Sequence, residues 1–195
     1  MGGTRMLRTF IAYVEDLPGV LARVVSLFRR RVYNIDTLTV GRTHRPGISR
    51  LTVVIEADDD EARRIEANLY KLVNVLYVED TSRAATVSRE LVLIKVKVEK
   101  AARAEVMSLV DVFRAKVVDI SPEGVIVEVT GTSEKIDGLV EVLAPFGITE
   151  MVRSGLVAMV RSAEGTEARE TALKSVERKV ASRIATVAER MDVDG

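Results

Sequence analysis

Residues 7–28 read LRTFIAYVEDLPGVLARVVSLF, and this stretch decides the fold of the first half of the chain. The stretch begins β-rich, with Phe10, Ala12 and Val14 on one face, as in a strand that covers a core. The segment DLPG at 16–19 then ends the strand. The apolar residues that follow recur at helical spacing. A buried strand, a tight loop and an amphipathic helix are therefore predicted.

The pattern continues outward from this unit. Further strands are predicted near 34–41, 51–55 and 75–78, and a second helix begins at the acidic run 58–61, where negative charge suits a helix N-terminus. Together these elements form a β-α-β-β-α-β unit. The small and polar residues 81–88 are then expected to be a linker.

A second β-α-β-β-α-β unit of similar length follows the linker. Its predicted strands lie near 92–98, 117–120, 125–129, 148–152 and 156–160, and its predicted helices lie near 106–113 and 132–143. The predicted fold class is α+β, with two ferredoxin-like domains at 1–82 and 83–162. In each domain, two helices are expected on one side of a four-stranded sheet.

The tail at 163–195 has apolar residues spaced three and four apart, which is helical and heptad-like. These residues are Leu173, Val176, Val180, Ile184, Val187 and Met191. Its polar face is charge-balanced rather than basic, so we expect this C-terminal helix to pack on the body or on a partner.

The composition excludes several classes of protein. The 195 residues include no cysteine and one histidine, so Cys-based zinc sites, iron–sulfur clusters and thiol nucleophiles are excluded. The 29 basic and 29 acidic side chains balance, which supplies no general attraction to nucleic acid or an anionic membrane. No apolar run approaches the roughly 18 residues of a membrane span. We therefore expect a cytoplasmic protein with neither nucleic-acid nor membrane partners.

The segment 16–19 is the most informative candidate site. It joins a buried strand to a helix N-terminus, whose unsatisfied N–H groups attract a carboxylate, and Gly19 leaves room for close approach. Asn34 begins the next strand and is expected to line the same cleft. Asp16 at a helix start is stabilised as the anion, which makes it a poor proton donor. The alternative of an ordinary helix start followed by a turn asparagine stays open.

Other candidates favour structural roles. His44 has no orienting partner or nucleophile nearby in sequence, so a solvated loop histidine is expected. Arg29–Arg31 point around a helix rather than to one face. The acidic run 58–61 lacks the spacing of a calcium loop, and phosphate-binding glycine motifs are missing. The sequence contains no assembled catalytic site or metal site.

Several motifs resemble one family in order along the chain. The first half carries Glu15–Val24, Leu27–Phe28, Tyr33–Ile35, Leu38–Gly41, Pro46–Thr52, Tyr70–Val75 and Arg89–Leu91, and the second half carries Phe113–Asp119, Thr130–Lys135 and Arg153–Gly155. The first set is similar to the N-terminal ACT domain of acetolactate synthase small (regulatory) subunits, and the second set to their C-terminal domain. The resemblance covers residues 6–162.

The resemblance implies a non-catalytic regulatory subunit. Such subunits bind and activate a catalytic (large) subunit, and they confer feedback inhibition by a branched-chain amino acid, usually valine. Thiamine diphosphate, magnesium and FAD are expected on the catalytic subunit, with no cofactor in this chain. ACT domains pair into a homodimer, and the effector binds at their interface. The expected effector-binding residues are Asp16, Leu17, Gly19, Val20, Asn34 and Ile35.

Alternatives and departures accompany this resemblance. A free-standing amino-acid-binding ACT regulator is one alternative, and a small ferredoxin-like phosphatase that uses Asn34 is another. Many family members have asparagine where this chain has Asp16. An ionised aspartate accepts but does not donate hydrogen bonds, so it suits an ammonium group. Val32 replaces a common glycine, and a β-branched residue there predicts a regular helix end without positive φ.

Overall fold

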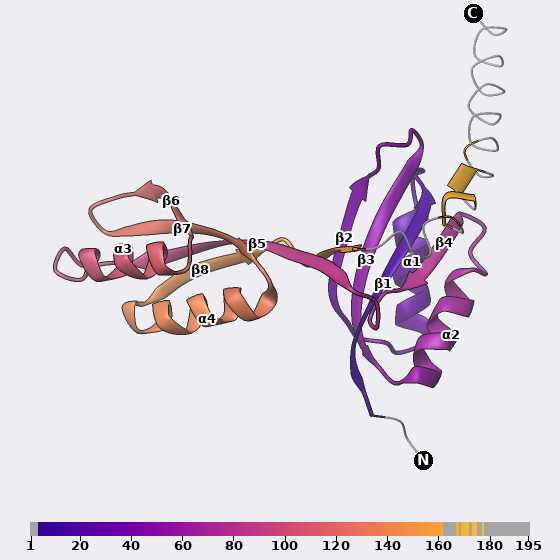
Figure 1. Cartoon of the computed structure of the whole chain (residues 1–195), viewed down its shortest axis with the longest axis horizontal. Helices are drawn as coiled ribbons and strands as arrows, with labels where there is room; N and C mark the ends of the chain where they lie inside the picture. The colour runs from indigo at the N-terminus through magenta and orange to yellow at the C-terminus, as the bar shows by residue number, and fades with distance from the viewer. Residues whose placement is uncertain (1–3, 162–166, 168, 172, 175–176, 178–195) are drawn as a thin grey trace, which may run out of the picture. The chain divides into compact units, whose positions relative to one another are not determined.

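The computed structural model describes residues 4–161, 167, 169–171, 173, 174 and 177 (Figure 1). These residues form two compact units. The first unit contains the residues up to Thr86 together with the described residues from Ala158 onward, and the second unit is Val87–Val157.

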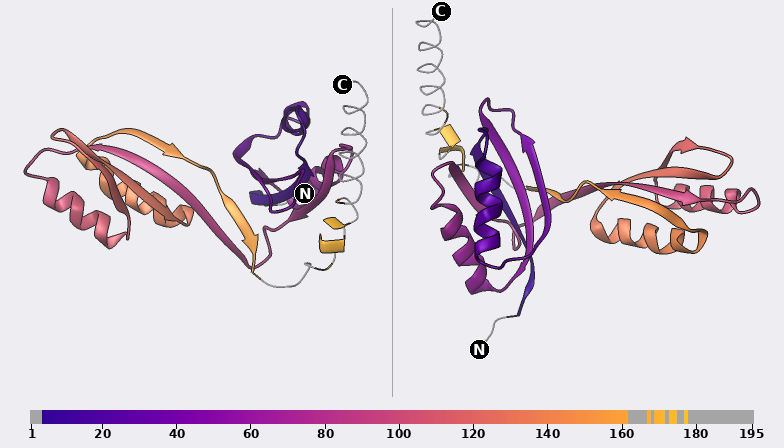
Figure 2. Two further views of the ribbon diagram at one scale, coloured as in Figure 1. Left: turned by 90° about the horizontal axis from the view of Figure 1, so that it is seen from above. Right: turned by 180° about the vertical axis from the view of Figure 1, so that it is seen from behind.

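The first unit follows the predicted order of strands and helices. Its elements are β1 (Met6–Glu15), α1 (Val20–Arg30), β2 (Ile35–Arg42), β3 (Ile48–Ala57), α2 (Asp59–Leu69) and β4 (Val75–Asp80). The strand order is β2-β3-β1-β4, and all neighbouring strands are antiparallel. Both helices cover one face of the sheet (Figure 2). This is the predicted ferredoxin-like arrangement, in which β2 and β4 are the edge strands.

Alternation along β1 separates the two faces of this sheet. Phe10, Ala12 and Val14 belong to the core on the helix side, as the sequence predicted. Ile11 and Tyr13 fall between them and point to the opposite face. A buried aliphatic core beneath α1 and α2 therefore fixes the position of the β1–α1 connection.

The second unit repeats the same topology. Its elements are β5 (Thr86–Lys97), α3 (Arg103–Val112), β6 (Lys116–Ile120), β7 (Gly124–Gly131), α4 (Ser133–Leu143), the 3-10 turn η1 (Ala144–Phe146) and β8 (Ile148–Arg153). The boundary between the units falls at the start of β5 and within β9 (Val157–Val160). Four strands lie in the order β6-β7-β5-β8, and β9 also pairs with β5. The core is largely aliphatic and includes Val92, Ile94 and Val96 of β5. The predicted α+β fold is confirmed.

The expected linker ends earlier than the sequence suggested. Residues 86–88 belong to β5, although their small and polar character predicted a linker as far as 88. The strand extends because β9 supplies backbone partners for β5. Such long-range pairing is invisible to local composition.

The end of α1 corrects a second prediction. Val32 adopts a left-handed conformation with φ 58°, although a regular helix end was expected. The N–H of Val32 donates to the Arg29 carbonyl, and the N–H of Tyr33 donates to the Phe28 carbonyl, each at 3.1 Å. These two bonds form a Schellman motif, which satisfies helix-end carbonyls and outweighs the strain of a β-branched residue. Arg114 after α3 has the same conformation, with φ 50°.

The predicted tail helix is described in part. Residues 167, 169–171, 173, 174 and 177 are helical, and Leu173 is 3% exposed. The burial of Leu173 supports packing on the body of the protein. The predicted positions Val176, Val180, Ile184, Val187 and Met191 lie outside the described residues.

Candidate functional site

The β1–α1 loop, Asp16–Gly19, is exposed at the end of β1 and is held by backbone hydrogen bonds. The N–H of Asp16 donates to the Gly47 carbonyl at 2.9 Å, and the N–H of Leu17 donates to the Glu15 carbonyl at 3.0 Å. Gly47 lies in the turn between β2 and β3. The loop is therefore tied to the β2–β3 turn as well as to its own strand.

Helix α1 begins without a side-chain cap. Gly19 is the N-cap residue, has φ 82°, and would carry a Cβ atom with nothing within 4 Å. The first turn of α1 contains no acidic residue and receives no side-chain hydrogen bond. By contrast, Asp58 caps α2 and Thr132 caps α4. The N–H groups of the first turn of α1 are thus without a side-chain acceptor, which suits a bound carboxylate.

Asp16 forms an ion pair with Arg42. Its carboxylate lies 3.1 Å from Nε of Arg42, the last residue of β2. The Arg42 side chain is 86% exposed and that of Asp16 is 37% exposed, so the pair is in contact with solvent. The guanidinium offsets a negative charge that would otherwise repel an approaching carboxylate. Sequence reasoning gave Arg42 no role, because this contact joins residues that are far apart in the chain.

Polar contacts next to the loop link the end of β1, Asn74 and helix α1. The Glu15 carboxylate accepts a hydrogen bond from the Asn74 amide, and the Asn74 side-chain oxygen accepts one from Arg23 of α1 at 2.5 Å. The N–H of Glu15 also donates to the Asn74 carbonyl at 2.9 Å. Asn74 is 7% exposed. Sequence reasoning missed Asn74, since its only local signal was a polar residue between a helix and a strand.

Asn34 and Ile35 lie at the other end of the sheet. Ile35 pairs with Ile55, which in turn pairs with Arg8 near the start of β1. Arg8 and Glu15 are seven positions apart, which corresponds to about 23 Å along a strand. Asn34 therefore does not line the same cleft as Asp16 within one chain, and that prediction is wrong. The reason is that α1 carries the chain back to the start of β1 before β2 begins.

The remaining expected effector residues differ in exposure. Leu17 is 53% exposed at the loop, whereas Val20 is 4% exposed and belongs to the core. Ile35 is half-buried and packs against the same core. The structure thus brings Asp16, Leu17, Gly19 and the backbone of Val20 together in one chain, and it does not bring Asn34 and Ile35 to them.

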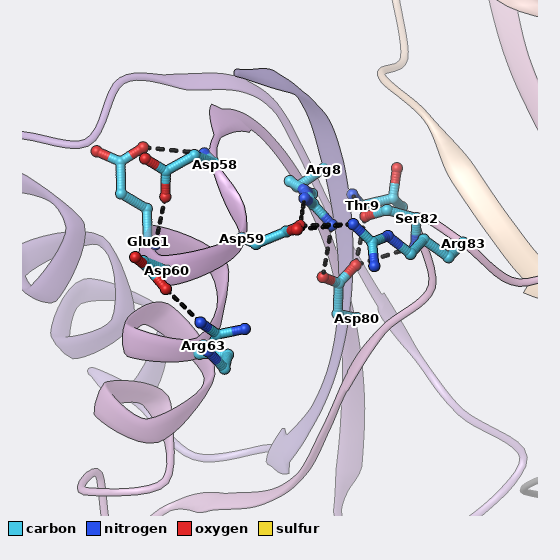
Figure 3. A network of polar contacts seen from close by, with 10 residues as sticks. All are labelled: Arg8, Thr9, Asp58, Asp59, Asp60, Glu61, Arg63, Asp80, Ser82 and Arg83. Carbon is cyan, nitrogen blue, oxygen red and sulfur yellow. Dashed lines mark hydrogen bonds and ion pairs between the residues drawn. The ribbon is translucent and has the colours of Figure 1, made fainter. Parts of the chain in front are cut away.

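The acidic run 58–61 has a structural role, as predicted (Figure 3). Asp58 accepts a hydrogen bond from the N–H of Glu61 at 2.8 Å, and Glu61 accepts one from the N–H of Asp58 at 3.0 Å, which forms a capping box. Asp60 pairs with Arg63 on the helix surface. The residues that the structure describes contain no cluster of histidine or acidic side chains able to hold a metal ion.

Asp59 joins a network around a buried arginine (Figure 3). Arg8 is 3% exposed and donates to Asp59, while its other guanidinium nitrogen lies 3.6 Å from Asp80. Arg83 donates to both oxygens of Asp59 at 2.8 Å. The Arg8 hydrogen bond is the main cause that holds the pKa of Asp59 below its ordinary value. This network ties β1, α2 and the segment after β4 together.

The other basic candidates contact no assembled site. His44 is exposed, as are Arg29 and Arg30. Arg31 donates to the side-chain oxygen of Asn68 at 3.1 Å, which braces α1 against α2. In the described ranges, no helix is long and apolar enough to cross a bilayer.

The second unit lacks an equivalent of the β1–α1 loop. Helix α3 also begins without a side-chain cap, but its N-cap residue Ala102 has φ −88° and carries a Cβ atom, and Glu105 supplies negative charge in its first turn. The geometry therefore defines a class of protein: two tandem ferredoxin-like domains, of which the first carries an uncapped helix start suited to a small carboxylate ligand.

Comparison with known proteins identifies the family. Residues 10–77 match the model described as an AHAS small subunit-like ACT domain, and residues 89–162 match the model described as the small subunit of acetolactate synthase. The acetolactate synthase small subunit of Mycolicibacterium smegmatis is 45% identical over 157 residues, which covers 80% of this chain and 92% of that protein. The chain belongs to the acetolactate synthase small-subunit family.

Two further relatives agree with this assignment. A probable acetolactate synthase small subunit of Methanothermobacter thermautotrophicus is 46% identical over 151 residues, which covers 77% of this chain and 90% of that protein. The crystal structure of the acetolactate synthase small subunit from Thermotoga maritima superposes with a TM-score of 0.76 at 37% identity, and covers 80% of this chain and 98% of that chain. The C-terminal family match ends at residue 162, so residues 163–195 lie beyond it.

Proposed function

We propose that this chain is a non-catalytic subunit that activates the thiamine-diphosphate-dependent large subunit of acetolactate synthase and makes it sensitive to a branched-chain amino acid, with valine as the first candidate. Family membership supports the partner. In this proposal thiamine diphosphate, magnesium and FAD belong to the large subunit. The contribution of this chain is to bind the amino acid and to transmit its presence.

The observation that carries the amino-acid site is the uncapped start of α1. The first-turn N–H groups are free of side-chain acceptors, and Gly19 places no Cβ atom in front of them. The effector's carboxylate would bind there. The Asp16 carboxylate would accept from the effector's ammonium group, and Leu17 would contact its aliphatic side chain.

A second copy of the chain would complete the site. Strand β2 is an edge of its sheet, so its outer backbone groups can pair with another β2. In a two-fold antiparallel pair, the first residue of one strand lies beside the last residue of the other. Asn34 of one copy would then approach Arg42 of the other copy, and Arg42 holds Asp16. This arrangement would bring Asn34 close to Asp16, although the two residues lie at opposite ends of the sheet, about 23 Å apart along a strand, within one chain.

The effector must favour one state of the holoenzyme. A ligand shifts an equilibrium only by the difference between its affinities for the two states. Valine bound across two β2 edges would stabilise the paired ACT domains. We expect the inhibited holoenzyme to contain that paired form.

The proposal is tested by reconstitution. The full chain is mixed with the acetolactate synthase large subunit, and acetolactate formation is measured with and without valine. We expect the chain to raise the activity and valine to lower it again. The matched variant Asn34→Ala is expected to keep the activation and to lose most of the valine sensitivity. An unchanged activity on addition of the chain would refute the proposal. Tight valine binding without any effect on the synthase would instead favour a free-standing amino-acid regulator.

A further inference from the structure

The face of the first sheet opposite α1 and α2 is buried at its centre. Ile11 pairs with Thr52 on one side and with Glu79 on the other, so the three residues form a row across this face. Ile11 is 1% exposed and Thr52 is 2% exposed, although neither belongs to the core on the helix side. Some other part of the chain must therefore cover this face.

The C-terminal segment, defined as the described residues from Ala158 onward, lies on this face. Arg50, whose neighbour Tyr13 points to the same side, donates to the Ala158 carbonyl. Arg169 lies 3.6 Å from the carboxylate of Glu79. Leu173 is almost fully buried. The polar contacts place the segment against the sheet, and the burial of Leu173 agrees with this placement.

A buried arginine clamps the segment at the β2–β3 turn. One Arg45 guanidinium nitrogen donates to Glu170 at 2.7 Å, and the other lies 3.2 Å from Glu177. The Arg45 side chain is only 9% exposed, so it depends on these two carboxylates for charge compensation. The Arg45 hydrogen bond also holds the pKa of Glu170 below its ordinary value, which agrees with an ionised partner.

The β2–β3 turn, which contains Arg45, also forms a hydrogen bond with the β1–α1 loop. The Thr43 hydroxyl contacts the backbone of Arg45 and donates to the Ile48 carbonyl, which closes the turn. Two positions after Arg45, the Gly47 carbonyl accepts the N–H of Asp16. A continuous set of short-range contacts thus connects Glu170 to Asp16 through a single turn.

We propose that the C-terminal segment is an intramolecular brace whose docking strengthens amino-acid binding at the β1–α1 loop. Docking fixes Arg45 and its turn, the turn fixes Asp16, and a pre-ordered loop loses less conformational freedom when a ligand binds. Thermodynamic linkage requires the reverse effect as well: the bound amino acid strengthens docking by the same factor. The inference rests on the proposed effector site, and the brace itself lies largely outside the region shared with the family.

Docking is tested first, without any effector. The chain has no cysteine, so Leu173→Cys introduces a single thiol in the full-length protein. Lys174→Cys is the matched exposed control, since its side chain is 70% exposed. We expect the thiol at 173 to react with a disulfide reagent at least about ten-fold more slowly than the thiol at 174. Adding Glu170→Gln and Glu177→Gln to Leu173→Cys should abolish most of this protection. Equal reaction rates at 173 and 174 would overturn the proposal.

Coupling is tested next by calorimetry with valine. The double variant Glu170→Gln/Glu177→Gln should bind valine about five-fold more weakly or worse than the wild type. Glu167→Gln, a conservative change at an exposed position of the same helix, should bind valine normally. Leu173→Ser, which weakens docking but leaves both partners of Arg45 in place, should show the same direction of change as the double variant. Cooperative thermal unfolding of each variant confirms that the domains remain folded.

The effect of valine on docking is the third measurement, because linkage acts in both directions. Valine should slow the reaction of the thiol at 173 and leave that at 174 unchanged. Wild-type affinity in both docking-deficient variants would overturn the brace, even if the effector site is real. Failure of the wild type to bind valine, with the thiol at 173 still protected, would instead refute the proposed effector site and the coupling with it.

Discussion

The carboxylate of Asp16 lies 3.1 Å from Nε of Arg42, so the end of β2 neutralises the charge at the start of the β1–α1 loop. The pair changes the electrostatic effect that Asp16 has on a ligand at the loop. Alone, an ionised Asp16 would repel the carboxylate of an amino-acid ligand; the guanidinium beside it offsets that repulsion, while Asp16 can still accept from the ligand's ammonium group.

Arg42→Gln tests this relationship. Valine binding should weaken by up to about five-fold, because exposed ion pairs contribute roughly 0.2–1 kcal/mol. In an Asp16→Asn background the same change should have little effect, since there is no charge left to neutralise. Calorimetry on the four proteins of this cycle measures both effects. Arg30→Gln, at the exposed far end of α1, is the control and should bind as the wild type does. A larger loss in the Asp16→Asn background would contradict the explanation.

Gly19 and Gly41 form a matched pair for testing the helix start. A Cβ atom at either position meets nothing within 4 Å, but only Gly19 has a positive φ. We expect Gly19→Ala to lower the free energy of unfolding by about 1–2 kcal/mol through left-handed strain, and also to weaken valine binding. Gly41→Ala should change stability by less than about 0.5 kcal/mol. Urea unfolding measures both variants. Equal effects at the two positions would show that strain at Gly19 is unimportant.

Val32 offers a stabilising change. It is 91% exposed with φ 58°, so its side chain contributes little packing and the backbone is strained. Val32→Gly removes about 1–2 kcal/mol of strain and adds about 0.5–1 kcal/mol of unfolded-chain entropy, which leaves a gain of up to about 1.5 kcal/mol. Urea unfolding should show this gain, whereas Val32→Ala, which keeps the Cβ atom, should show much less. A destabilised glycine variant would mean that the Schellman motif tolerates valine without strain.

Asp59 should contribute to a pH-dependent stability. Because Arg8 lowers the pKa of Asp59 in the folded state, its contribution is present above the ordinary value of 3.8 and is lost as pH falls through the lowered value. Wild type and Asp59→Asn should therefore differ in urea midpoint at about pH 7, and the difference should shrink as the pH falls below 3.8 and through the lowered pKa of Asp59. Asp60→Asn is the control, because its pair with Arg63 is exposed and should contribute little at either pH. A difference that persists in acid would exclude ionisation of Asp59 as its cause.

Much of the fold followed from local patterns. The alternation of Phe10, Ala12 and Val14 and the apolar periodicity of α1 predicted both elements, because strand and helix periods differ. Asp58 caps α2 at the acidic run that predicted the helix start, and Thr132 caps α4 at the first residue of the helix predicted near 132–143. The prediction of a regular helix end at Val32 was wrong. The hydrogen bonds of the Schellman motif, and not the conformational preference of one residue, determine the backbone conformation there.

The candidate site was only partly predictable. Asp16 and Gly19 form one loop because they are adjacent in sequence, and local chemistry predicted their role. Asn34 was misplaced within the chain, since the direction of α1 and the register of β2 determine where that strand begins.

By itself, the sequence determined two β-α-β-β-α-β units with aliphatic cores and a glycine-bearing loop before the first helix, because periodicity and turn chemistry act over a few residues. Only the tertiary structure decided that Arg42 faces Asp16, that Arg45 meets Glu170, and that β2 forms an edge. Those relationships join residues far apart in the chain, and strand order, register and burial bring them together.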